Sequence, residues 1–410
     1  MKHGPDRRGL IITAILLFAF SMRPAVNSLG AVVPELRAMT GLSGTISGIL
    51  LSLPTLAFAL LGMSSPVLVR RLGSHLLVLV CLAAIIAGQL LRAIVSGTAA
   101  LFGGSMLALA GIAVGNVLLP SLVRLHFPDR IGAMTAAYTT LLVGGGALSA
   151  AVSVPIESAL DGDWRTAIGV WVIPAALAAI PWLAMSRQRP GVWGGVQTVN
   201  IRAVARTRIG WSLAIYFGVQ SLLAYVMYGW LSQILTERGL SPTLAALQVG
   251  IVAAISVPMA ALAPTAVSRM RSPTGLVIAL AACYIIGFVG LIAVLGRGVM
   301  VFTVLIGIGG GAFPLALTFV AARARTPTAT LSLSAFTQSV GYLIASIGPF
   351  GFGVLHDAVG GWRVPLIVLS SIAVIQATFG IASGRKRFVE DQLTISTPAV
   401  ATRYTSPPEL

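Results

Sequence analysis

Long apolar runs alternate with short polar or basic segments along almost the entire sequence. A helix needs about 20 apolar residues to cross the hydrocarbon core of a bilayer, and twelve runs have about this length. The pattern therefore predicts an all-α membrane protein with twelve transmembrane helices. The twelve runs are residues 10–34, 45–69, 76–96, 99–123, 131–155, 165–186, 209–235, 244–268, 274–295, 298–322, 331–355 and 362–383.

The composition agrees with a membrane protein. Hydrophobic residues make up 57% of the chain and charged residues 9%, and the mean hydropathy is +0.94, whereas about a quarter of the residues in a soluble domain are charged. The first run follows Lys2, Arg7 and Arg8 and so resembles a signal peptide, but it is too long and has no small-residue cleavage site. We interpret it as an uncleaved first helix. Cys81 and Cys283 fall inside predicted spans and predict no disulfide framework.

The distribution of basic residues predicts the orientation of the helices. The 27 Lys and Arg residues outnumber the 11 Asp and Glu residues, which gives a net charge of +16. With both termini on one side of the membrane, that side holds 20 basic residues and the other side six, and Arg23 lies within the first span. Because Lys and Arg are enriched on the cytoplasmic side, we expect both termini in the cytoplasm, a location in the inner (plasma) membrane and no nucleic-acid partner. The six are Arg37, Arg92, Arg165, Arg238, Arg297 and Arg363.

The chain divides into two similar halves. Residues 187–208 contain five Arg together with Pro and Gly, which is typical of a linker. GLS at 41–43 recurs at 239–241, and WR at 164–165 recurs at 362–363, both at an offset of 198 residues. Duplicated helical units are common in transporters, which bind their substrate near the midplane between the repeats. The predicted organisation is an N-terminal six-helix half (1–186), a cytoplasmic linker (187–208), a C-terminal six-helix half (209–384) and a disordered cytoplasmic tail (385–410).

Five segments carry a resemblance to a known family: RPAVNSLGAVVPELR, GNVLLPSLVRLHFPDRIGAMTAAYTT, QSLLAYVMYGWL, GGAFPLALTFVAAR and QSVGYLIASIGPFGFGVLHDAVGGW. With these motifs the sequence resembles the cyanate and 2-nitroimidazole transporter branch of the major facilitator superfamily. The resemblance covers all twelve spans. Two features differ from the family: Ser21 replaces the usual Asn, and SPVLVRRLGSH lacks the acidic residue of the loop between the second and third helices. The resemblance implies a fold of two pseudo-symmetric six-helix halves and transport by alternating access.

Arg23 is the strongest candidate for a functional residue. A charged side chain within a span costs at least ~2.5 to 3.5 kcal/mol on insertion scales, so it faces a cavity or a partner. No Asp or Glu lies at its depth in the predicted spans, since Glu35 is twelve residues away, roughly 18 Å along a helix. The planar guanidinium suits a small anion or a polarised carbonyl or nitro group. Asn27, one turn further on the same face, is expected to add a polar contact.

Polar side chains in other spans are weaker candidates, because intramembrane amides and hydroxyls also join helices, each worth about 0.6 to 2 kcal/mol. The resemblance strengthens Gln220 and Gln338, which lie in matched motifs. The remaining candidates for the solute site are Asn116, Tyr138, Tyr225 and Tyr342. We interpret the glycine-rich segments 144–146 and 307–312 as sites of close helix contact or bending, not as a nucleotide-binding fingerprint.

The sequence contains no arrangement that predicts catalysis. The four His residues lie at span ends or in loops and no acidic residue is central, so neither paired acids nor a nucleophile with a base is predicted. We expect no enzyme activity, cofactor or metal site, and a monomer in the lipid bilayer. Because the duplicated halves favour alternating access over a channel or sensor, we predict a secondary active transporter of a small polar or anionic, cyanate-like solute. The alternative is an exporter of nitroimidazole-like or other small drugs.

Overall fold

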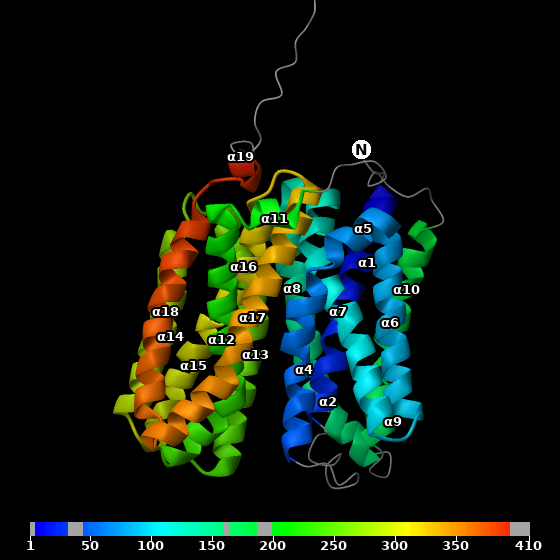
Figure 1. The fold of residues 1–410 in the computed structure, drawn as a ribbon. Coiled ribbons are helices and arrows are strands. Elements are labelled where there is room, and N and C mark those ends of the chain that lie inside the picture. Colours follow the sequence, from blue (N-terminus) through cyan, green and yellow to red (C-terminus); the bar gives the residue numbers. More distant parts are fainter. Residues whose placement is uncertain (1–4, 32–43, 160–163, 187–198, 394–410) are drawn as a thin grey trace, which may run out of the picture.

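The computed structural model describes residues 5–31, 44–159, 164–186 and 199–393, and these residues form helices and connecting loops without strands (Figure 1). In the first half, the helices are α1 (Pro5–Met22), α2 (Pro24–Ala31), α4 (Gly44–Gly62), α5 (Ser65–Leu72), α6 (Ser74–Ile94), α7 (Thr98–His126), η1 (Pro128–Arg130), α8 (Ile131–Ala159), α9 (Trp164–Gly169) and α10 (Val172–Ser186). In the rest of the chain they are α11 (Ile201–Val204), α12 (Arg208–Glu237), α13 (Pro242–Arg269), α14 (Thr274–Ala293), η2 (Gly296–Gly298), α15 (Val299–Gly309), α16 (Ala312–Ala322), α17 (Pro327–Val359), α18 (Arg363–Gly384) and α19 (Val389–Leu393).

The described helices account for the predicted spans. Among the described residues, eleven segments are long and apolar enough to cross a membrane, and the pair Leu53–Gly62 of α4 and Ser65–Leu72 of α5, bent by 55°, makes twelve when it is counted as one span. The predicted all-α membrane fold is therefore confirmed. The tenth span is also broken, between α15 and α16. Here a Cβ at Gly309 would lie 2.7 Å from the ring of Tyr284, and one at Gly311 would lie 2.6 Å from Met259. This confirms the interpretation of segment 307–312 as a site of close contact and bending.

The two halves of the chain lie side by side (Figure 1). In the figure, α1 to α10 run from blue through cyan to green, and α12 to α18 run from green through yellow to red. One end of the bundle holds the start of α1 together with α11 and α19, and we call it the linker end; α9 lies at the opposite end, which we call the distal end. The repeated WR pair begins the last span of each half, because α9 starts at Trp164 and α18 starts at Arg363. The other repeat begins at Gly41, outside the described residues.

The buried apolar side chains show where the halves meet. The largest cluster contains residues of both halves, among them Phe58 and Val123 from the first half and Leu317 and Phe336 from the second, and it extends to Val389 at the linker end. A second cluster belongs to the second half alone and extends to Trp362 at the distal end. In the described part of the chain, the halves therefore share one core at the linker end and have separate cores toward the distal end.

The prediction of a disordered tail from residue 385 is wrong for residues 385–393, because α19 is anchored at the linker end. Val389 is fully buried and its N–H bonds to the carbonyl of Arg323 at 2.9 Å. The carboxylate of Glu390 accepts the backbone N–H groups of Arg325 and Thr326, which start the turn before α17. Asp391 pairs with the guanidinium of Arg325, and this hydrogen bond lowers the pKa of Asp391. Residues 394–410 lie outside the described residues.

Candidate functional site

A break in the first span positions Arg23. Helix α1 ends at Met22 and α2 begins at Pro24, because Pro24 has no N–H with which to bond the carbonyl of Phe20. The carbonyl of Arg23 instead accepts hydrogen bonds of 3.0 Å from the N–H groups of Val26 and Asn27, and these bonds start the new helix. The side chain of Arg23 is half-buried at this break.

Two glycines of α8 allow the broken helix to approach closely. A Cβ at Gly145 would lie 2.7 Å from the carbonyl oxygen of Phe20, the atom that Pro24 leaves without its helical donor. A Cβ at Gly146 would lie 2.7 Å from Nδ2 of Asn27 and 3.3 Å from Cβ of Arg23. All three contacts are shorter than ordinary van der Waals distances, so larger residues at these two positions would displace the break. The predicted role of segment 144–146 in close helix contact is therefore confirmed at Gly145 and Gly146.

The guanidinium of Arg23 reaches across to the second half of the protein. It interacts with the hydroxyl groups of Tyr225 on α12 and Tyr342 on α17. Its Cζ atom also lies 5.8 Å from the centre of the Phe313 ring on α16. Tyr225 and Tyr342 lie near the middles of helices of 30 and 33 residues. The charge is therefore held between the halves, deep in the bundle.

The Phe313 ring beside this charge belongs to a cluster of aromatic rings. The ring of Tyr342 lies 5.1 Å from that of Phe217 and 5.0 Å from that of Phe58, and Phe217 lies 5.7 Å from Phe313. Phe58 comes from α4 in the first half, whereas the other rings come from the second half. We call Arg23, Tyr225, Tyr342 and the three Phe residues the arginine site. The three Phe residues were not predicted, because a Phe in an apolar helix carries no sequence signal that separates a site wall from ordinary packing.

A second polar contact joins the halves next to the arginine site. Gln338 lies one turn before Tyr342 on α17, and its Nε2 donates to the backbone carbonyl of Asn116 on α7 at 3.1 Å and to the Ser334 hydroxyl at 2.8 Å. Asn116 is buried, and among the described residues its Nδ2 has no hydrogen-bond partner. The structure therefore brings the predicted residues Gln338 and Asn116 together at the interface, toward the linker end from Arg23.

The structure places two predicted residues differently. Gln220 lies within the second half, where its Nε2 donates to the hydroxyl of Tyr284 at 3.1 Å and its Oε1 accepts from Gln376. These bonds tie α12 to α14 and α18 and do not bring Gln220 to Arg23. Tyr138 is buried in the core shared by both halves, and its hydroxyl has no partner among the described residues.

Arg92 lies in the last turn of α6 and packs against the broken first span. It is only 2% exposed, and its Nη2 donates to the carbonyl of Ala25 at 3.1 Å. Ala25 lies two residues after Arg23, so Arg92 supports the broken helix from behind. A signal was available in the sequence, because three apolar residues (93–95) follow Arg92 and place it about one turn inside the helix end.

No described carboxylate compensates the charge of Arg23. The ion pairs among the described residues join Arg325 to Asp391 at the linker end and His356 to Glu237 and Asp357 at the distal end. Within the same residues, no group of three or more His, Cys, Asp or Glu side chains converges that could hold a metal ion. An arginine flanked by two hydroxyls and aromatic rings is suited to bind a small ligand with negatively charged or polarised oxygen atoms.

Comparison with known proteins identifies the class to which this fold and site belong. The family model of the Major Facilitator Superfamily matches residues 9–349, and the chain belongs to this family of transporters. It is 34% identical to the uncharacterized transporter YycB of Bacillus subtilis (strain 168), and the match covers 92% of this chain and 94% of that one. It is 32% identical to the 2-nitroimidazole transporter of Escherichia coli (strain K12), over 93% and 96% of the two chains. It is 26% identical to the cyanate transport protein CynX of the same organism, over 90% and 97%.

A solved structure supports the assignment at the level of the fold. The structure of the transporter FucP in the outward conformation superposes with a TM-score of 0.75 at 12% identity and covers 92% of this chain and 98% of its own. The protein is therefore a multi-pass membrane transporter of a small solute, as the sequence motifs predicted.

Proposed function

We propose that the protein is a secondary active transporter that binds a small anionic, cyanate-like solute at the arginine site and moves it by alternating access. The observation that carries this proposal is the contact of Arg23, from the first half, with Tyr225 and Tyr342 of the second half. A solute bound to these three groups touches both halves at once. Its binding is therefore coupled to their relative movement.

The charge balance of the site favours an anion or a polarised oxygen over a cation. No described carboxylate pairs with the guanidinium of Arg23. The two tyrosine hydroxyls and the guanidinium can all donate hydrogen bonds to the same ligand. One relative is a cyanate transport protein, which supports a small linear anion as the first choice.

The aromatic rings favour a second candidate, a nitroimidazole-like compound. Phe313 is partly exposed and provides a flat apolar surface beside the charge, and a planar heterocycle can stack on it while its nitro oxygens meet Arg23. The relative named a 2-nitroimidazole transporter is consistent with this candidate. Cyanate, which has no ring, gains little from such walls.

We propose that this conformation is open toward the distal end. Three hydrogen bonds join the halves toward the linker end. Arg124 donates to the carbonyl of Ala324, Thr139 to the carbonyl of Ala260 at 2.9 Å, and Gln338 to the carbonyl of Asn116. These bonds must break when the linker end opens. With the linker end in the cytoplasm, as the distribution of basic residues predicts, the structure corresponds to an outward-facing state. We further expect the protein to act as a monomer in the plasma membrane, without nucleic acid.

Flux measurements in proteoliposomes test the proposal and separate the two solutes. Labelled cyanate and labelled 2-nitroimidazole are supplied separately, and saturation and counterflow are recorded for the parent protein. A carrier shows both effects for its solute, and their absence for both compounds would contradict the proposed substrates.

The variant Phe313→Leu identifies which solute uses the aromatic walls. Loss of one aromatic contact of about 0.5–1.5 kcal/mol weakens binding of the heterocycle by roughly 2- to 12-fold and leaves cyanate unaffected. Phe350→Leu is the matched control, because Phe350 is 78% exposed on α17 and lies outside the arginine site.

A further inference from the structure

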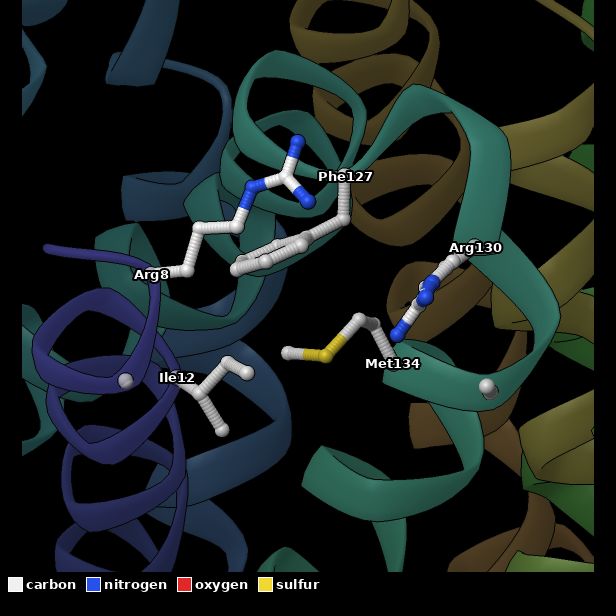
Figure 2. A pocket seen from close by; sticks show the side chains of 7 residues that line it. Arg8, Ile12, Phe127, Arg130 and Met134 are labelled. Carbon is white, nitrogen blue, oxygen red and sulfur yellow. The ribbon is translucent and has the colours of Figure 1, made fainter. Parts of the chain in front are cut away.

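A pocket of about 510 Å³ lies at the linker end of the first half and shares no lining residue with the arginine site (Figure 2). It is formed by the first turns of α1, by η1 and by the first turn of α8. Arg8 and Arg130 stand on its rims, and Phe127, Met134 and Ile12 lie between them (Figure 2). The pocket therefore combines two positive charges with an apolar floor.

Both arginines are available to a ligand. Arg8 and Arg130 are exposed, and neither belongs to the ion pairs found among the described residues. Asp129 precedes Arg130 in η1, but it is also exposed and does not belong to these ion pairs. Two guanidinium groups on opposite rims provide complementary charge for a phosphate group placed between them.

The floor and the surroundings of the pocket fit the edge of a membrane. Phe127 and Met134 are buried beneath the arginines, so a ligand that enters between the charges meets apolar side chains. Leu10, next to the pocket on α1, is 37% exposed. Helix α10, which packs beside α1, exposes apolar residues along its outer face, namely Ile173, Leu177, Ile180 and Leu183. The pocket thus lies where a surface that faces lipid chains meets the charged end of the bundle.

From this arrangement we infer that the pocket binds the headgroup of an anionic phospholipid, with the phosphate between Arg8 and Arg130 and the glycerol and upper acyl chain on Phe127, Met134 and Ile12. A basic pocket between helices at the membrane surface is a recurrent way to bind anionic headgroups. A free anion would use only the arginines and leave the apolar floor without a partner. A zwitterionic headgroup brings an ammonium group toward two positive charges, which opposes binding.

The test uses the full-length protein in detergent and native mass spectrometry to count bound lipids. Dioleoyl phosphatidylglycerol and dioleoyl phosphatidylcholine are titrated separately, because they share acyl chains and differ in headgroup charge. Inorganic phosphate in large excess is added in a third arm to distinguish a lipid site from a free-anion site. The variants are Arg8→Gln and Arg130→Gln, each made alone so that loss of both charges does not impair insertion. Arg70→Gln is the matched control, since Arg70 is an exposed arginine on α5 outside the pocket.

We expect phosphatidylglycerol to bind more tightly than phosphatidylcholine. Each pocket variant should weaken the binding of phosphatidylglycerol by about 5-fold, which is the contribution of one basic residue to the affinity for anionic lipid. The control variant keeps the affinity of the parent, and phosphate does not displace the lipid. Equal affinity for the two lipids, or unchanged affinity in both pocket variants, would overturn the proposal. Displacement by phosphate would show a free-anion site and would also overturn it. Solute flux through the arginine site is measured separately, and a protein without solute flux would still give the same lipid-binding results.

Discussion

The exchange of Arg23 for Lys separates the charge of the arginine site from its geometry. The guanidinium interacts with Tyr225 and Tyr342 and faces Phe313. Its five N–H donors lie in one plane, so it can contact both hydroxyls and still donate to a solute, whereas a lysine ammonium is a compact point charge. We therefore predict that Arg23→Lys keeps the attraction for an anion but loses at least one hydrogen bond to it.

The size of the effect follows from the contacts that are lost. A hydrogen bond to a charged group contributes about 1.5–3 kcal/mol, so Arg23→Lys raises the dissociation constant of the solute by at least ~10-fold. Arg23→Ala removes the charge as well, and we predict loss of transport. No described carboxylate is left unpaired by this change, and the insertion cost of about 2.5–3.5 kcal/mol for a central Arg disappears. The melting temperature of Arg23→Ala should therefore equal or exceed that of the parent.

The assay compares solute uptake into proteoliposomes at matched protein density and melting temperatures with and without solute. Arg271→Ala is the control, because Arg271 is exposed in a loop at the linker end. Retained transport in Arg23→Ala would refute the assignment of the site. A solute-induced thermal shift of equal size in the parent, Lys and Ala forms would show that the solute binds elsewhere.

Three further predictions follow from the surroundings of the site. Gln220→Ala removes two hydrogen bonds inside the second half, so it should lower the free energy of unfolding by about 1–3 kcal/mol without changing solute affinity. Gln338→Ala should change the free energy of unfolding by no more than about 1 kcal/mol and should increase cysteine labelling at the linker end. The reverse pattern would contradict these roles. Arg92→Gln should raise the dissociation constant of the solute by about 10-fold because the turn at Arg23 loses its support, and unchanged affinity would show that Arg92 serves packing alone. A cysteine at position 200 should react with membrane-impermeant reagents only from the cytoplasmic side; labelling from outside would reverse the proposed orientation.

The sequence was sufficient to predict the fold because the length and spacing of apolar runs determine which segments cross a bilayer. The role of Arg23 as the central cation followed from the insertion cost of an unpaired charge. Its partners could not be ranked from the sequence, because helix rotation decides which polar side chain faces the interface. Tyr225 and Gln220 are five residues apart on α12, about 140° around the helix, and the first meets Arg23 whereas the second bonds within its own half.

Two other features depend on packing that a linear pattern does not contain. The burial of Arg92 depends on a close contact with Gly104 of α7, which places its side chain inside the bundle. The segment after residue 384 is polar and was predicted to be disordered. In the structure, Val389 is buried and Glu390 bonds to the start of α17, and both contacts come from residues more than 60 positions apart.

A structure of the protein with bound solute tests the central claim most directly. The account predicts solute density between the two halves, with an oxygen or other acceptor atom of the solute within hydrogen-bond distance of the Arg23 guanidinium and in contact with Tyr225 or Tyr342. Density for the solute away from Arg23, with the guanidinium still held by the two tyrosines, would contradict it.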